Sequence, residues 1–197
     1  MECTIEGLSA EVLASGQASV FARVELTVNL PPVPGQVSFA EDSPALISAP
    51  RALVDTVGLI TSGWTDSADD LPLRYAFFVD TSGLVTPRDG STMAASQAEI
   101  QTILSGSTIR VLRGADLNAE LATVLPQGLA VPGGPDVQMT LIATARDPLG
   151  AVGLAATHIM VAPALSAEEA GNSSAVTNAA AGQLSKALES ASSSDPA

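Results

Sequence analysis

Three carboxylates lie within one short stretch of this sequence, at Asp66, Asp69 and Asp70, and form its densest acidic cluster. Calcium takes about six to eight oxygen ligands, so these side chains could supply part of a calcium site. Their spacing differs from that of an EF-hand loop. It is typical of a solvated turn between strands, where Asp side chains accept hydrogen bonds from nearby backbone amides. We favour the turn and keep calcium as the only candidate cofactor.

The other residues give little basis for catalysis. His158 is the only histidine, so a histidine-rich metal site is excluded and a Ser-His-Asp triad would depend on this one residue. The nucleophile pattern Gly-x-Ser-x-Gly and the phosphate-binding patterns Gly-x-x-x-x-Gly-Lys and Gly-x-Gly-x-x-Gly are absent. A hydrolase would have to use Asp66 and Asp70 as its carboxylates. We therefore expect a protein that is not an enzyme, with a hydrolase as the weaker alternative.

The charge and hydropathy of the chain argue against nucleic-acid-binding and membrane-spanning proteins. The formal net charge is −13, from 8 basic and 21 acidic residues, so the clustered cations that bind nucleic acid are missing. The longest apolar run, residues 151–165, is too short to span a bilayer and contains Pro163. Residues 1–4 are acidic where a signal peptide would be basic. We expect either a cytosolic structural protein or a piece of a larger protein that carries both signal and anchor.

Two side chains suggest chemistry with groups outside the chain. Cys3 is the only cysteine, so it is either an incidental buried thiol or the partner of a thiol elsewhere. Asn172 opens the only N-glycosylation sequon and would carry a glycan if the chain is extracellular.

Short strands separated by turn signals must position these residues. Alternating or continuous apolar patterns predict strands at residues 37–40, 56–64, 73–79, 105–113, 121–125, 137–145 and 151–161. Residues 147–150 have the pattern of a type I turn between antiparallel strands. Ile100, Ile103 and Leu104 predict one or two helical turns after Ser96. The fold expected is all-β, an immunoglobulin-like or fibronectin type III-like β-sandwich.

The ends of the chain differ from its middle. Residues 1–30 hold a predicted strand at 19–29 and a second candidate at 1–13, which we assign to a preceding, truncated sandwich. The apolar face of the first strand comprises Val20, Ala22, Val24, Leu26 and Val28. Residues 31–35 carry three prolines and are predicted to be a linker, because proline cannot lie in the middle of a sheet. The main sandwich is then expected over residues 36–163.

Residues 164–197 are predicted to form a tail that is helical and then disordered. Ser166 and Glu169 have the spacing of a capping box, which marks the start of a helix. A helical apolar stripe comes next, made of Val176, Ala180, Leu184 and Leu188. Residues 190–197 are expected to be disordered.

Aromatic residues are scarce and lie mainly in one segment. Residues 63–78 contain the only Trp and the only Tyr of the chain, Trp64 and Tyr75, together with Phe77. Large aromatic side chains contribute much of the energy of a core when they are buried. We therefore expect these three residues to lie between the two sheets.

Three motifs, in this order, resemble the REJ (receptor for egg jelly) domain of the polycystin family. The first joins Gly-Trp-x-Asp to Pro-Leu-x-Tyr-x-Phe, the second is Leu-Pro-x-Gly, and the third is Asp-x-x-Gly-Ala. The motif residues are Gly63, Trp64, Asp66, Pro72, Leu73, Tyr75, Phe77, Pro126, Gly128, Asp147, Gly150 and Ala151. Family members often carry cysteines near the Trp, whereas this chain has only Cys3, so its sandwich must hold by packing alone.

The resemblance implies a PKD-like sandwich in the extracellular part of a larger membrane protein. Its implied role is adhesion, ligand or partner binding, or spacing, on the outer side of the plasma, ciliary or flagellar membrane. Implied partners are the other modules of the same polypeptide, protein or glycan ligands at the cell surface, and a polycystin-type channel. The alternative is a calcium-stabilised adhesion module of another PKD- or cadherin-like family, and the weaker one remains the hydrolase.

Overall fold

A computed structural model describes residues 29–89, 95–129, 133–170, 181, 182 and 185. Their strands are β1 (Gln36–Phe39), β2 (Thr56–Ser62), β3 (Arg74–Asp80), β4 (Ile109–Asp116), β5 (Glu120–Val124), β6 (Val137–Arg146) and β7 (Val152–Val161). The helices are α2 (Gln97–Leu104) and α3 (Ala167–Ala170), with 3-10 turns η1 (Pro44–Leu46) and η2 (Ala68–Asp70).

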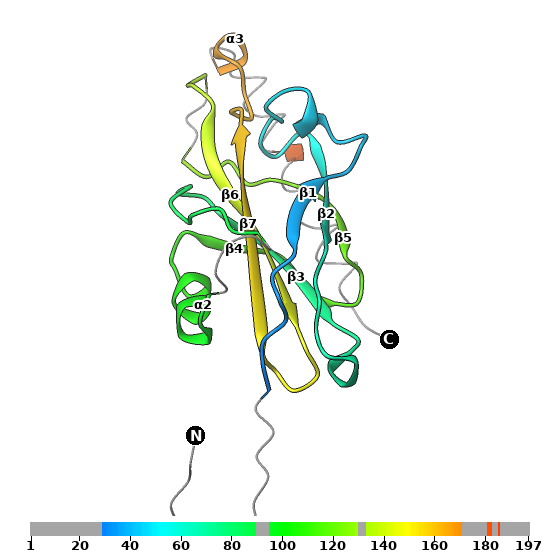
Figure 1. Cartoon of the computed structure of the whole chain (residues 1–197). Coiled ribbons are helices and arrows are strands. Elements are labelled where there is room, and N and C mark those ends of the chain that lie inside the picture. Colours follow the sequence, from blue (N-terminus) through cyan, green and yellow to red (C-terminus); the bar gives the residue numbers. More distant parts are fainter. Residues whose placement is uncertain (1–28, 90–94, 130–132, 171–180, 183–184, 186–197) are drawn as a thin grey trace, which may run out of the picture.

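The strands form two antiparallel sheets that face each other (Figure 1). One sheet has the order β1-β2-β5 and the other the order β4-β3-β6-β7. The predicted all-β sandwich is therefore confirmed. The immunoglobulin-like or fibronectin type III-like subtype stays a prediction.

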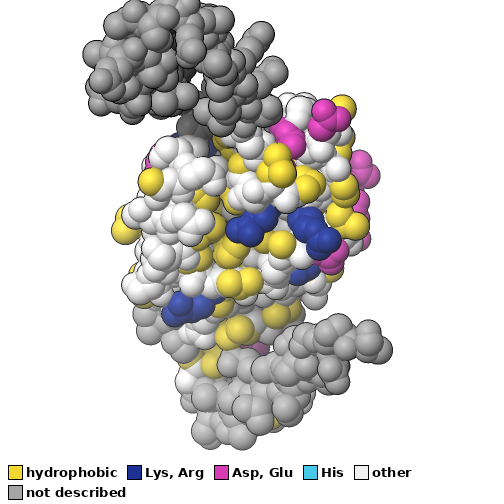
Figure 2. Space-filling view, turned by 90° about the horizontal axis from the view of Figure 1, so that it is seen from below, with side chains coloured by type: hydrophobic (Ala, Val, Ile, Leu, Met, Phe, Trp, Pro, Cys, Tyr) yellow, Lys and Arg dark blue, Asp and Glu magenta, His cyan; other side chains and the backbone are white. Residues whose placement is uncertain are grey.

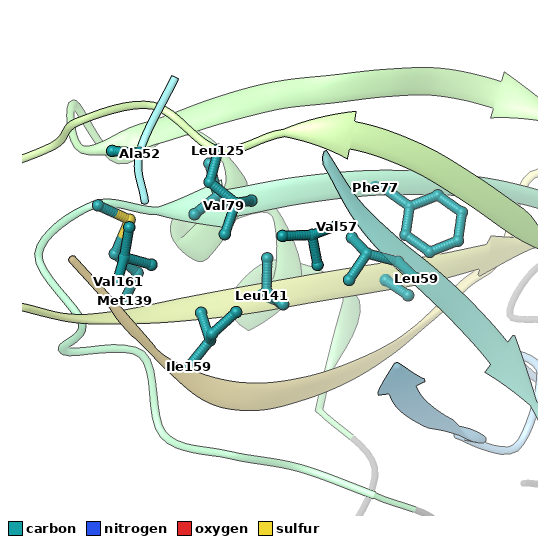
Figure 3. Close-up of a cluster of buried hydrophobic side chains, with 11 residues drawn as sticks. Ala52, Val57, Leu59, Phe77, Val79, Leu125, Met139, Leu141, Ile159 and Val161 are labelled. Atoms are coloured by element: carbon teal, nitrogen blue, oxygen red, sulfur yellow. The ribbon is translucent and has the colours of Figure 1, made fainter. Parts of the chain in front are cut away.

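Alternation along the strands builds the core between the sheets. Tyr75, Phe77 and Val79 of β3 all point inward, as the sequence pattern predicted, and Phe77 is only 1% exposed. The buried core shown in Figure 3 comprises Ala52, Val57, Leu59, Phe77, Val79, Leu125, Met139, Leu141, Ala143, Ile159 and Val161. Aliphatic side chains from both sheets thus supply most of the buried surface, which suits a sequence with few aromatics.

The opposite face of the larger sheet is covered by α2 instead of being exposed to water. Ile100 of α2 packs with Ile142 of β6 and Leu154 of β7 in a second buried cluster. The Ser96 side chain caps this helix by accepting a hydrogen bond from the Glu99 amide at 3.2 Å. The predicted helical turns at 96–104 are confirmed, and they bury a strand face that β6 would otherwise present to solvent.

Several predicted boundaries move by a few residues. The strand predicted at 56–64 ends at Ser62, and the one predicted at 105–113 runs from Ile109 to Asp116, because the C-terminal turn of α2 occupies its first residues. The β6–β7 hairpin turns where predicted, with the Gly150 amide donating to the Asp147 carbonyl at 3.2 Å. The capping box also forms, since the Glu169 amide donates to Ser166 Oγ at 3.2 Å and the Ser166 amide donates to Glu169 Oε2 at 2.8 Å.

The Pro-rich segment 31–35 lies against the sandwich. Pro32, Pro34 and Gly35 are buried, and the Val33 amide donates to the Thr65 carbonyl at 2.8 Å. The proposed division of the chain at this segment stays a prediction. The described residues do not include Cys3, Asn172, the strand predicted at 1–13 or residues 19–28 of the strand predicted at 19–29. They also do not include the tail at 190–197 or the apolar stripe of Val176, Ala180, Leu184 and Leu188.

Within the described residues, no helix is long and apolar enough to cross a bilayer.

Candidate functional site

A cleft lies at the end of the sandwich where the β6–β7 hairpin turns, which we call the hairpin end. Three segments that are far apart in the sequence line it: residues 29–33, 65–70 and 148–149. The hairpin-end cleft has a volume of about 780 Å³. It brings the acidic turn and the hairpin motif together, so it is the place to assess the residues singled out by the sequence.

Trp64 is half-buried behind this end. It comes after β2 instead of lying within it, and its indole Nε1 donates to Thr61 Oγ1 at 2.6 Å. Its ring centroid lies 6.5 Å from that of Tyr75, with an angle of 52° between the planes. Both rings pack against the edge of the core, whereas Phe77 is inside it. Trp64 therefore closes the end of the core and is not available as a binding platform.

The backbone comes unusually close to this indole. A Cβ atom on Gly153 of β7 would lie 2.5 Å from the Pro32 carbonyl oxygen and 3.0 Å from the Trp64 ring. Gly63 has a φ of +74°, which favours glycine, and this conformation ends β2 just before the Trp. The first motif thus fixes how the Pro-rich segment crosses the end of the sandwich.

The acidic cluster forms a locally hydrogen-bonded turn. Asp66 Oδ1 accepts from the Ser67 amide at 2.9 Å, and Asp70 Oδ2 accepts from the Ser67 hydroxyl. Asp69 is exposed to solvent. Over the residues that the structure describes, no three His, Cys, Asp or Glu side chains are grouped so that they could hold a metal ion. Pro72 and Leu73 lead the chain from this turn into β3, and the Leu73 side chain is buried.

Asp147 ties the hairpin to the N-terminal segment. Its carboxylate is 3% exposed; Oδ1 accepts from the Ala151 amide at 2.9 Å and Oδ2 accepts from Asn29 Nδ2 at 2.8 Å. Gly150 has a φ of +96°, as the turn requires. The third motif therefore joins the hairpin to the N-terminal segment. The sequence predicts the turn but not the contact with Asn29.

The second motif lies away from the cleft. The Leu125 carbonyl accepts from the Leu53 amide at 2.8 Å, and Pro126 and Gly128 lead toward β6. Gly128 has a φ of +56°, and a Cβ atom there would lie 2.6 Å from Met139 Cε. This motif packs the approach to β6 against the core.

A smaller hollow, of about 420 Å³, lies between loop 81–89 and α2. At its base Asp80 is 1% exposed and accepts hydrogen bonds from the Leu84 amide at 3.0 Å and the Val85 amide at 3.1 Å. Burial alone raises the pKa of Asp80, but hydrogen bonds from Thr108, Ser82 and Val85 outweigh it and lower the pKa to about 2. The residues Thr-Ser-Gly after Asp80 are the sequence signal for such a turn.

His158 has a structural setting. It lies opposite Thr140 in the β6–β7 ladder, and its Nδ1 is 3.0 Å from Thr140 Oγ1. That hydroxyl also donates to the Val85 carbonyl at 3.0 Å. The imidazole therefore takes part in joining loop 81–89 to the sheet.

The hairpin end offers exposed apolar side chains and carboxylates for contact with another group. Leu30 and Leu149 are each 71% exposed, and both line the cleft. Figure 2 looks onto this end and shows hydrophobic side chains exposed among basic and acidic ones. Surfaces of this kind contact other proteins or other parts of the same polypeptide.

Fold and cleft together define a β-sandwich module with an apolar surface at one end. The family model of the REJ domain matches residues 9–195, nearly the whole chain, and the chain belongs to the REJ family. The resemblance that the motifs indicated is thereby confirmed. Among curated proteins, none matches this chain.

Proposed function

We propose that this chain is a non-catalytic module in the extracellular part of a larger polycystin-like membrane protein. Its role there is to space neighbouring modules and to present its surfaces for adhesion or partner binding. Membership of the REJ family supports the polycystin-like setting. The partners proposed are adjacent modules, protein or glycan ligands at the cell surface, and a polycystin-type channel, and no resident cofactor is needed.

The observation that supports the spacing role is the position of the two segments that flank the seven strands. Segment 29–35 begins at the hairpin end, whereas α3 lies at the opposite end of the sandwich (Figure 1). A module built in this way holds the chain before its first strand and the chain after its last strand apart by the full length of the sandwich. Ten-residue strands such as β6 and β7 span about 33 Å at about 3.3 Å per residue.

The cell-surface setting is tested by sending the full chain through the secretory route with a signal peptide and a membrane anchor added. We expect protein at the surface of intact cells, accessible to added protease, and a glycan at Asn172. A glycosidase should then increase the mobility of the chain on a gel, and Asn172→Gln should show the increased mobility without the enzyme. Retention of the chain inside the cell in a misfolded form would contradict the proposal.

A further inference from the structure

Arg74 and Arg146 lie directly opposite each other on the outer face of the larger sheet. They are the first residue of β3 and the last residue of β6, and they pair in the antiparallel ladder between these strands. Their neighbours Tyr75 and Ala145 pack toward the core, so both arginines point away from it. Both are exposed, and the Cβ atoms of residues paired in this way are about 4.5–5.5 Å apart. The sheet thus holds two positive charges close together.

Neither of these guanidinium groups has a hydrogen-bond or ion-pair partner within the described part of the chain. Each of the other described arginines has a polar partner; these are Arg51, Arg88, Arg110 and Arg113. Like charges directly opposite each other destabilise a sheet. An anionic group placed between the two guanidiniums would remove this repulsion and accept charge-assisted hydrogen bonds from both.

Exposed aliphatic side chains flank the arginine pair. Leu71 precedes Arg74 by three residues and Leu149 follows Arg146 by three residues, and they are 53% and 71% exposed. Figure 2, which looks onto the hairpin end, shows basic side chains near hydrophobic ones. A group that binds here therefore meets aliphatic surface as well as positive charge. A protein surface with a carboxylate beside aliphatic side chains is complementary to both.

The charge of the whole chain restricts the kind of anion that fits. The formal net charge is −13, so most of the molecule repels a polyanion. A single carboxylate avoids most of this repulsion, because salt screens exposed charges beyond about 8–10 Å at physiological ionic strength. The favoured partner therefore carries one carboxylate on a surface that is otherwise neutral or basic.

We propose that Arg74 and Arg146 form a docking site for a protein partner that presents a carboxylate beside aliphatic side chains. The two guanidiniums donate to the carboxylate oxygens, and Leu71 and Leu149 contact the aliphatic part. This site deepens the role in partner binding proposed above and rests on it.

Titration of the full chain, followed by nuclear magnetic resonance of the arginine side chains, tests the site. The probe is the blocked peptide acetyl-Leu-Glu-Leu-amide, and its control, acetyl-Leu-Gln-Leu-amide, lacks the carboxylate. We expect saturable shifts of the Arg74 and Arg146 Nε signals with the first peptide only. Arg74→Gln and Arg146→Gln should each weaken binding at least about tenfold, because each removes a hydrogen bond to a charged group. The matched control Arg110→Gln also removes one exposed positive charge and should bind like the wild type.

Three outcomes of the titration would overturn the assignment. Equal shifts with the two peptides would show that the carboxylate is not recognised. An equal loss of binding in Arg110→Gln would show general attraction by charge instead of a site. Tighter binding of inorganic phosphate than of the glutamate peptide would make the arginine pair a phosphate site.

Thermal unfolding separates binding from folding. Arg74→Gln and Arg146→Gln should each unfold at or above the wild-type midpoint, because each removes the repulsion between the two charges. A lower midpoint in both variants would show that the arginines support the fold, which would also overturn the proposal. All these measurements use the chain in solution, so a negative result here is distinct from a failure of the cell-surface test.

Discussion

Asp80 is the residue whose charge contributes most clearly to stability. Its folded pKa, about 2, is below the ordinary value of 3.8, so the ionised form stabilises the folded state. This stabilisation is fully present above about pH 4 and is lost as the pH falls toward 2. The difference corresponds to about 2 kcal/mol.

Urea unfolding as a function of pH tests this. From about pH 5 to about pH 2, the free energy of unfolding of the wild-type chain should fall by about 2 kcal/mol more than that of Asp80→Asn. The variant should already be less stable at neutral pH by a similar amount, because loop 81–85 loses its ionised acceptor. Parallel pH profiles for the two proteins would show that Asp80 does not have this role.

Gly153 is expected to tolerate no side chain. Gly153→Ala would place a methyl group against the Pro32 carbonyl and the Trp64 ring, and overpacking of this kind costs about 1–3 kcal/mol. Gly114→Ala is the matched control, since a Cβ atom on that strand glycine meets nothing within 4 Å. Thermal unfolding should show a lower midpoint for the first variant alone. Equal midpoints would mean that the Pro-rich segment shifts to accommodate the methyl group at little cost in stability.

For single residues, the sequence indicates turns but not the distant residues that they contact. The acidic turn and the hairpin at 147–150 were predictable because Asp, Pro and Gly act on their own backbone. The bond between Asn29 and Asp147 joins residues 118 positions apart, and no local pattern encodes it. Trp64 was expected inside the core and closes its end instead, because β2 stops two residues earlier.

Among the elements, α2 protects the free edge of β7. The Gln97 side chain donates to the Val152 carbonyl at 2.6 Å and accepts from the Val152 amide at 3.3 Å, as a neighbouring strand would. Further along, the Arg88 and Ala156 backbones exchange hydrogen bonds of 2.8 and 2.7 Å. Covered edges prevent sheets from pairing with other chains.

Gln97→Ala should therefore open the start of β7. We expect the Val152 amide to exchange at least about tenfold faster and the free energy of unfolding to fall by about 1 kcal/mol. Gln101→Ala, on the same helix, should leave both quantities unchanged. An unaltered exchange rate at Val152 would show that the side chain is dispensable at this edge.

Most strands were predictable from alternation, and contacts between elements explain where alternation fails. β4 was weakly marked because its pairing with β3 has register shifts between Tyr75 and Phe78, which interrupt the period of two. The outer face of β6 contains Thr140, Ile142 and Thr144. Alternation alone predicts that this face is exposed to solvent. Burial of that face by α2 is a tertiary effect that only the assembled fold reveals.

For the whole molecule, the strongly negative charge of −13 acts on association and not on the fold. The core is mostly aliphatic, and two ion pairs among the described residues, Arg51 with Glu169 and Arg88 with Glu99, lie at the surface. Surface pairs contribute little to stability. Sequence composition predicts that nucleic acid is not a partner, whereas the apolar hairpin end became visible only in three dimensions.

The unequal lengths of the outer strands give this module a direction of mechanical weakness. A load applied between Leu30 and Ala170 acts along the strands and shears the ladders that hold β1 and β7. Four residue pairs hold β1 to β2, whereas ten hold β7 to β6, and bonds sheared together share the load.

In single-molecule stretching between those two residues, β1 should detach first. The chain released should match the segment between Leu30 and the start of β2 at Thr56, and a first event that frees β7 would contradict this order. Such a module would lengthen by one limited step under tension while its four-stranded sheet stayed folded.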